Sequence, residues 1–182
     1  LEPITLTWRF FLQHPRELSL MAPVNFSFGF NAALLVNVVD GSISAVRLGE
    51  SSVPILTGVS AGMAAAVALP LTIAARRWQR GLEMVIVLGA LCLAVMPSVI
   101  LMDYLFDLGG LGWPGLVSIY AVQGIGRSVW EGVFKAQWAS RFGKSAPGAF
   151  ANLIVQFGSS SIVAYLLLPK LPLPAACAIC IA

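Results

Sequence analysis

Charged residues are scarce in this chain. Among 182 residues there are 11 Lys and Arg, 8 Asp and Glu and one His, so charged side chains make up 10% of the sequence. A soluble domain usually carries about 25%, and this deficit leaves too few ionisable groups to cover a surface that faces water. The cations are also scattered and form no basic stripe, which argues against nucleic acid as a partner. We therefore expect a lipid bilayer to cover most of the surface.

Chemically reactive groups are equally scarce. The single histidine, His14, lies beside Pro15 in a charged segment, where a solvated side chain is the expectation, and no nucleophile lies next to a base. Cys92, Cys177 and Cys180 lie in apolar runs without a nearby His or acidic residue. The CxxC spacing of the last two therefore indicates small apolar helix residues and not a redox or metal site. The sequence predicts no enzyme activity, no metal site and no cofactor.

Long apolar runs are abundant, since 58% of the residues are hydrophobic. A membrane-spanning helix needs about 20 such residues, so the runs predict an all-α, polytopic transmembrane bundle of about six spans. Residues 1–17 form a cytoplasmic juxtamembrane segment, and residues 18–182 form the bundle. The chain starts at Leu1 and stops within an apolar run, so we expect a fragment with a truncated sixth span. The expected spans cover residues 18–39, 52–75, 82–102, 113 to beyond 131, 148–168, and 174 onward.

Polar residues mark the connections between these spans. Asp40-Gly41-Ser42 begins a polar loop after the first span, and Asp103 begins a glycine-rich loop after the third. This interpretation leaves Glu131, apart from Glu83 at the start of the third span, as the acidic residue within a span.

Lys and Arg gather in alternate connectors. The connectors between them hold only Arg47 and Lys170. By the positive-inside rule the basic connectors face the cytoplasm. The N-terminal end is then cytoplasmic, and the loop with Asp103 and Asp107 lies on the far side. The basic positions are Arg9 and Arg16 before the first span, Arg76, Arg77 and Arg80 after the second, and Lys135, Arg141 and Lys144 after the fourth.

A charged motif lies in the fourth span. Arg127, Glu131 and Lys135 are spaced four apart, which places them on one face of a helix. Arg127 lies about 21 Å along a helix that begins at Trp113, inside a hydrocarbon layer about 30 Å thick. An unpaired Arg there is costly, so we expect it to pair with Glu131 while Lys135 extends toward water. The motif is either a gate that couples this helix to a neighbour or, preferably, an ion-pair network that fixes the helix position.

Uncharged polar residues also occur within the spans. Such side chains must face protein or water and not lipid. They either pack helices together, which is the commoner case, or line a solute path. The candidates are Asn25, Asn31, Gln123, Asn152 and Gln156.

The segment QGIGRSVWEGVFKA, residues 123–136, resembles the hallmark of the Unc-ninety-three-like family, a branch of the major facilitator superfamily named for regulators of potassium channels. Ala149-Phe150-Ala151-Asn152 and Gln156 are similar to the start of the family's next helix. The resemblance implies a bundle of twelve helices, of which this chain forms the C-terminal six and whose N-terminal half-bundle is a partner. It also implies that the charged residues at 127, 131 and 135 are the family's motif.

Three hypotheses about function follow. The preferred one, by resemblance, is a non-enzymatic accessory or regulator of a membrane protein such as an ion channel. The alternative is a secondary transporter of a small solute, in which Asn25, Asn31, Asn152 and Gln156 line one cavity. Residues 76–81 hold Arg but no Asp, unlike the superfamily's acidic–basic loop motif, which disfavours ordinary alternating-access gating. The third is a half-bundle without activity of its own.

Overall fold

The computed structural model describes residues 2–106 and 111–181, and within these ranges every regular element is a helix. The all-α prediction is thus confirmed for the described chain. Segments η1 and η2 are π-helical continuations of the helices before them, and η3 and η4 are short 3₁₀ turns. The elements are α1 (Glu2–Gln13), α2 (Pro15–Leu34), η1 (Leu35–Ser44), α3 (Ala45–Leu48), α4 (Ser52–Arg77), α5 (Gly81–Phe106), α6 (Trp113–Ser128), η2 (Val129–Phe134), α7 (Lys135–Phe142), η3 (Gly143–Ser145), α8 (Ala146–Leu167), η4 (Leu168–Lys170) and α9 (Leu173–Ile181).

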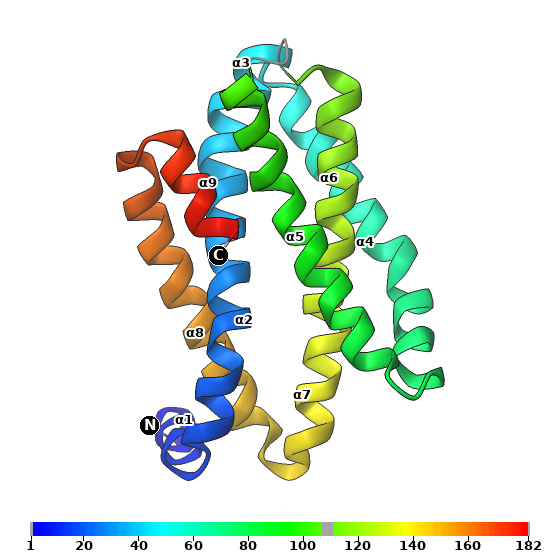
Figure 1. The fold of residues 1–182 in the computed structure, drawn as a ribbon. Coiled ribbons are helices and arrows are strands. Elements are labelled where there is room, and N and C mark those ends of the chain that lie inside the picture. Colours follow the sequence, from blue (N-terminus) through cyan, green and yellow to red (C-terminus); the bar gives the residue numbers. More distant parts are fainter. Residues whose placement is uncertain (1, 107–110, 182) are drawn as a thin grey trace.

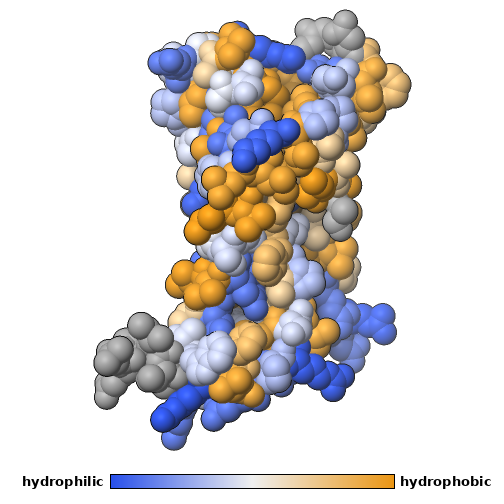
Figure 2. Space-filling view, turned by 90° about the vertical axis from the view of Figure 1, so that its left-hand side faces the viewer, coloured by the Kyte–Doolittle hydropathy of each residue, from blue (hydrophilic) through white to orange (hydrophobic). Residues whose placement is uncertain are grey.

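Several of these helices have membrane-spanning dimensions. Four helical stretches are long and apolar enough to cross a membrane, namely Pro15–Leu48, Ser52–Arg77, Gly81–Phe106 and Trp113–Lys170. The last of these turns back at η3, so that α8 runs along the bundle in the opposite direction to α6 and α7 (Figure 1). On the face seen in Figure 2, the most hydrophilic residues gather toward the two ends, and the band between them is mostly hydrophobic. These dimensions agree with an integral membrane protein.

The first long helix ends later than the sequence predicts. A loop was expected at Asp40-Gly41-Ser42, but η1 and α3 continue the helix to Leu48. The carboxylate of Asp40 accepts a hydrogen bond from the hydroxyl of Tyr120 on α6. The loop prediction was wrong because a partner on another helix satisfies the carboxylate, so Asp40 joins Glu131 as an acidic residue within a membrane-length helix. The other expected boundaries lie within a few residues of the observed ones.

The basic connectors share one end of the bundle. The α4–α5 connection and the α7–α8 turn lie at the same end as α1, and the α3–α4 connection lies at the opposite end (Figure 1). Arg80 and Lys144, which belong to the first two of these connectors, are therefore on one side. Of the expected acidic loop, Asp103 lies in the last turns of α5, whereas Asp107 lies outside the described residues.

The N-terminal segment is a helix packed against this basic end. Phe10 of α1 is buried, and its ring meets Phe142 of α7 edge-on with 4.8 Å between centroids. Trp138 of α7 is fully buried in the same cluster. Aromatic packing thus holds α1 to the end of the bundle.

Two helix pairs dominate the packing, and they correspond to each other. The pairs are α4 with α6 and α2 with α8. If α2, α4 and α5 are matched with α6, α8 and α9, each pair maps onto the other. A glycine faces a serine in both pairs, because Gly29 of α2 lies against Ser160 of α8 and Gly124 of α6 lies against Ser60 of α4. Each of these two helix pairs therefore packs closely through a glycine of one helix and a serine of the other.

The two-sided distribution of connectors can be tested by cysteine labelling. Gln79→Cys and Lys144→Cys should react with a membrane-impermeant maleimide from one side, and Ser51→Cys from the other, because these positions are exposed at opposite ends of the helices. Background labelling should be low since Cys92, Cys177 and Cys180 are buried. Labelling of Gln79→Cys and Lys144→Cys from different sides would contradict the topology.

The close approach of α4 and α6 predicts a size limit at Gly124. A Cβ atom added there would overlap the carbonyl oxygen of Ser60, so Gly124→Ala should destabilise the fold by about 1–3 kcal/mol, as overpacking does. Gly132→Ala is the matched control, because a Cβ at Gly132 has no neighbour within 4 Å. Thermal unfolding in detergent measures both, and equal melting temperatures would refute the tight contact.

Candidate functional site

Asn25 is the centre of a buried polar network. Its side chain is fully buried. The Nδ2 group donates to Oε1 of Gln156 at 2.6 Å, and its Oδ1 accepts from Nε1 of Trp130 at 3.2 Å. Gln156 in turn donates to the carbonyl oxygen of Leu18 at 3.2 Å. One amide thereby joins α2, α8 and η2.

Aromatic rings surround this network. The ring of Phe28 stacks on Trp130 with 4.1 Å between centroids and planes 6° apart, and Phe157 packs against both. Nζ of Lys135 lies 4.2 Å from the centroid of the Trp130 ring, a cation–π geometry. Trp130 therefore offers its N–H to Asn25 and a ring face to Lys135.

Arg127 and Glu131 form the ion pair that their spacing predicts, with 3.0 Å between Nε and Oε1. Both side chains are nevertheless open, at 40% and 41% exposure. Arg127 lies about 21 Å from the start of α6 at Trp113 and about 22 Å from the end of α7 at Phe142. The pair thus lies near the middle of a continuous helical stretch. Lys135 contacts the ring of Trp130 instead. The three charged residues of the motif therefore do not form one network.

A hollow of about 340 Å³ adjoins this ion pair. Its opposite wall is the middle of α4, whose lining residues are all alanines, namely Ala61, Ala64, Ala65 and Ala68. The ion pair and these alanines lie on opposite walls of the hollow, and we call the surface that they form together the α4–η2 face.

The remaining polar candidates lie at separate helix contacts. Asn31 donates to the carbonyl oxygens of Ser27 at 3.0 Å and Cys180 at 3.3 Å, which joins α2 to α9. Ser60 donates to Oε1 of Gln123 at 2.5 Å, which joins α4 to α6.

Asn152 lies at a further contact. Its Nδ2 donates to the carbonyl oxygens of Gly148 at 2.9 Å and Thr7 at 3.0 Å, which joins α8 to α1. Of the five intramembrane polar candidates, the structure brings together only Asn25 and Gln156.

The basic loop that the sequence predicts to be cytoplasmic lies on the surface of the structure. Arg76 and Arg77 lie in the last turn of α4, where cations interact favourably with the helix dipole, and Arg80 lies in the turn that follows. All three are exposed, and within residues 2–106 and 111–181 none of them has an ion-pair partner.

Sequence reasoning missed several polar contacts between helices. Trp130 lies inside the segment that carries the family resemblance, but its role as a donor to Asn25 has no local signal. Asp40 and Tyr120 are far apart in the sequence, and so are Arg47 and Asp103, which pair at 3.1 Å. The described side chains include no group of three or more His, Cys, Asp or Glu residues placed to hold a metal ion.

No protein-family model, curated protein or solved structure matches this chain. The fold and the site together define a class only: an all-helical protein with helices long and apolar enough to cross a membrane, whose polar side chains mainly join helices.

The Asn25 network predicts that replacing Asn25 by alanine destabilises the protein more than replacing another buried asparagine does. Asn25→Ala removes two hydrogen bonds between helices and should cost about 1–3 kcal/mol of stability. Asn37→Ala is the matched control, because the buried Nδ2 of Asn37 has no hydrogen-bond partner. Urea or thermal unfolding in detergent compares them. If Asn37→Ala lowers the stability as much as Asn25→Ala does, the hydrogen bonds of Asn25 make no special contribution.

Proposed function

We propose that this protein is the C-terminal half of a transporter-like bundle of about six spans, related to the Unc-ninety-three-like branch of the major facilitator superfamily, and that it acts as a non-enzymatic accessory or regulator of another membrane protein such as a potassium channel. The observation that carries the proposal is the open Arg127–Glu131 ion pair near the middle of a membrane-length helix. Exposure of the two charged side chains to lipid tails is energetically unfavourable. Contact with polar atoms of another protein is favourable.

The energetic argument concerns what covers the α4–η2 face. An Arg at the centre of a bilayer costs about 2.5–3.5 kcal/mol on insertion scales, and pairing with Glu131 offsets this cost only where the two side chains are shielded. With about two fifths of each side chain exposed, polar atoms of a further protein segment are needed. The adjacent alanine face allows the close helix approach that such packing requires.

The arrangement of the helices supports the same proposal. Inverted three-helix repeats are a common building unit of transporter folds, and the matched pairs α4–α6 and α2–α8 with their glycine contacts fit this pattern. In the proposed topology α9 begins the sixth span, and the end that carries α1 and the basic connectors is cytoplasmic. The N-terminal half-bundle and the regulated protein are the two partners for the exposed faces.

A secondary transporter is the second candidate. The hollow of about 340 Å³ beside Arg127 and Glu131 favours it, because a charged recess is what a solute path requires. The buried amides weigh against it, since Asn31, Gln123 and Asn152 are engaged at three different helix contacts instead of one cavity.

Co-purification tests the preferred function. The intact protein, co-expressed with a potassium channel, should be recovered with it and should change the channel current. Glu131→Ala leaves Arg127 unpaired at the interface and should reduce recovery by about tenfold or more. Glu83→Ala, an exposed acidic residue at the start of α5, is the control that should leave recovery unchanged.

A different combination of results would favour the transporter candidate. If the channel neither co-purifies nor changes its current, and proteoliposomes containing the intact protein take up a solute in a Glu131-dependent way, the transporter candidate replaces the regulator.

A further inference from the structure

A second pocket lies away from the charged motif. It has a volume of about 580 Å³ and is lined from η1, α3, α5, η4 and α9. These segments lie toward the end of the bundle opposite the basic connectors (Figure 1). Neither the regulator nor the transporter candidate uses this pocket.

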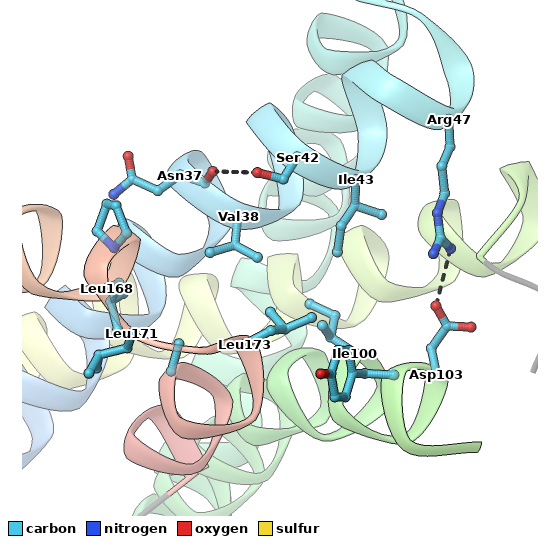
Figure 3. A pocket seen from close by; sticks show the side chains of 13 residues that line it. Asn37, Val38, Ser42, Ile43, Arg47, Ile100, Asp103, Leu168, Leu171 and Leu173 are labelled. Atoms are coloured by element: carbon cyan, nitrogen blue, oxygen red, sulfur yellow. Dashed lines mark hydrogen bonds and ion pairs between the residues drawn. The ribbon is translucent and has the colours of Figure 1, made fainter. Parts of the chain in front are cut away.

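One cation and one anion form its polar rim. Figure 3 shows Arg47 reaching across to Asp103, with 3.1 Å between Nη1 and Oδ2. Asp103 is 10% exposed and Arg47 is 39% exposed, so the guanidinium keeps donors free for a second acceptor. The rim is electrically neutral but carries both signs side by side.

Apart from Asn37, Ser42 and Tyr104, the remaining wall is apolar. Val38 and Ile43 of η1, Ile100 of α5 and Leu173 of α9 line it together with η4 (Figure 3). Asn37 also lines the pocket, and its buried Nδ2 has no hydrogen-bond partner. A ligand for this pocket must therefore combine an apolar body with a polar end.

The ion pair and the apolar wall lie at different depths along the helices, as the headgroup and the acyl chains of a lipid do. Asp103 lies about 33 Å along α5 from Gly81, which exceeds the hydrocarbon thickness of about 30 Å. Ile100 lies about one turn deeper on the same helix. The ion pair is thus level with lipid headgroups, and the apolar wall is level with acyl chains.

We propose that this pocket binds one zwitterionic phospholipid. The lipid phosphate accepts hydrogen bonds from Arg47, the ammonium group lies against Asp103, and an acyl chain lies along the wall formed by Ile100 and Leu173. Guanidinium–phosphate and carboxylate–ammonium contacts are charge-assisted and therefore strong. An anionic lipid lacks the ammonium group and meets the carboxylate with like charge. A diacylglycerol has no charge for either residue.

Native mass spectrometry of the intact protein tests this proposal. The protein in detergent is mixed with phosphatidylethanolamine, phosphatidylglycerol or diacylglycerol of equal chain length, and the retained lipid is counted. Phosphatidylethanolamine should be retained about tenfold more than either of the other two. The double variant Arg47→Gln with Asp103→Asn should lose this preference by about tenfold, as expected for the loss of charge-assisted contacts. Lys170→Gln is the control, since Lys170 lies in η4 but does not line the pocket.

A second variant keeps the test independent of the ion pair. Leu173→Trp fills the apolar part while Arg47 and Asp103 remain, and it should also abolish retention of phosphatidylethanolamine. Equal retention of phosphatidylethanolamine and phosphatidylglycerol, or full retention by both variants, overturns the proposal. These measurements involve neither channel association nor solute uptake, so their outcome is separate from that of the proposed function.

Discussion

The side chain of Asn25 holds three parts of the bundle together. Between helices in lipid the hydrophobic effect contributes little, because lipid tails are as apolar as leucine. Close packing and hydrogen bonds must then supply the specificity of helix contacts. The amide of Asn25 contributes both a donor and an acceptor, to Gln156 on α8 and from Trp130 on η2. Its complete burial means that neither bond competes with water.

The two π-helical segments lie where such contacts form. Segment η1 contains Asp40, which accepts from Tyr120, and η2 contains Trp130, which donates to Asn25. A π-helical turn has an additional residue and so rotates the following side chains relative to an α-helix. In η2 this is where the charged motif divides, with Glu131 beside Arg127 and Lys135 over the Trp130 ring. Backbone irregularity and polar contacts are thus parts of one arrangement.

The charged pairs of the long helices meet different surroundings. Arg127 and Glu131 lie near the middle of their helix and open onto the alanine face of α4, whereas Arg47 and Asp103 lie toward one end and close a pocket with an apolar wall. A charge near the membrane centre requires protein around it, and a charge at headgroup level does not. This difference in position is the reason why we propose a protein partner for one ion pair and a lipid for the other.

Composition and local pattern were enough to predict the helices, their membrane length and the gathering of basic connectors at one end, because each follows from residues close together in the chain. The Arg127–Glu131 pair was also predictable, since residues four apart on a helix are neighbours. The partners of the polar side chains were not. An amide on a helix can meet any of several neighbours, and only the packing of α2 on α8 and of α4 on α6 decides that Asn25 meets Gln156 and that Gln123 meets Ser60. Asp40 was misjudged for the same reason: local polarity indicated a loop, while Tyr120, 80 residues away in the chain, satisfies its carboxylate within the helix.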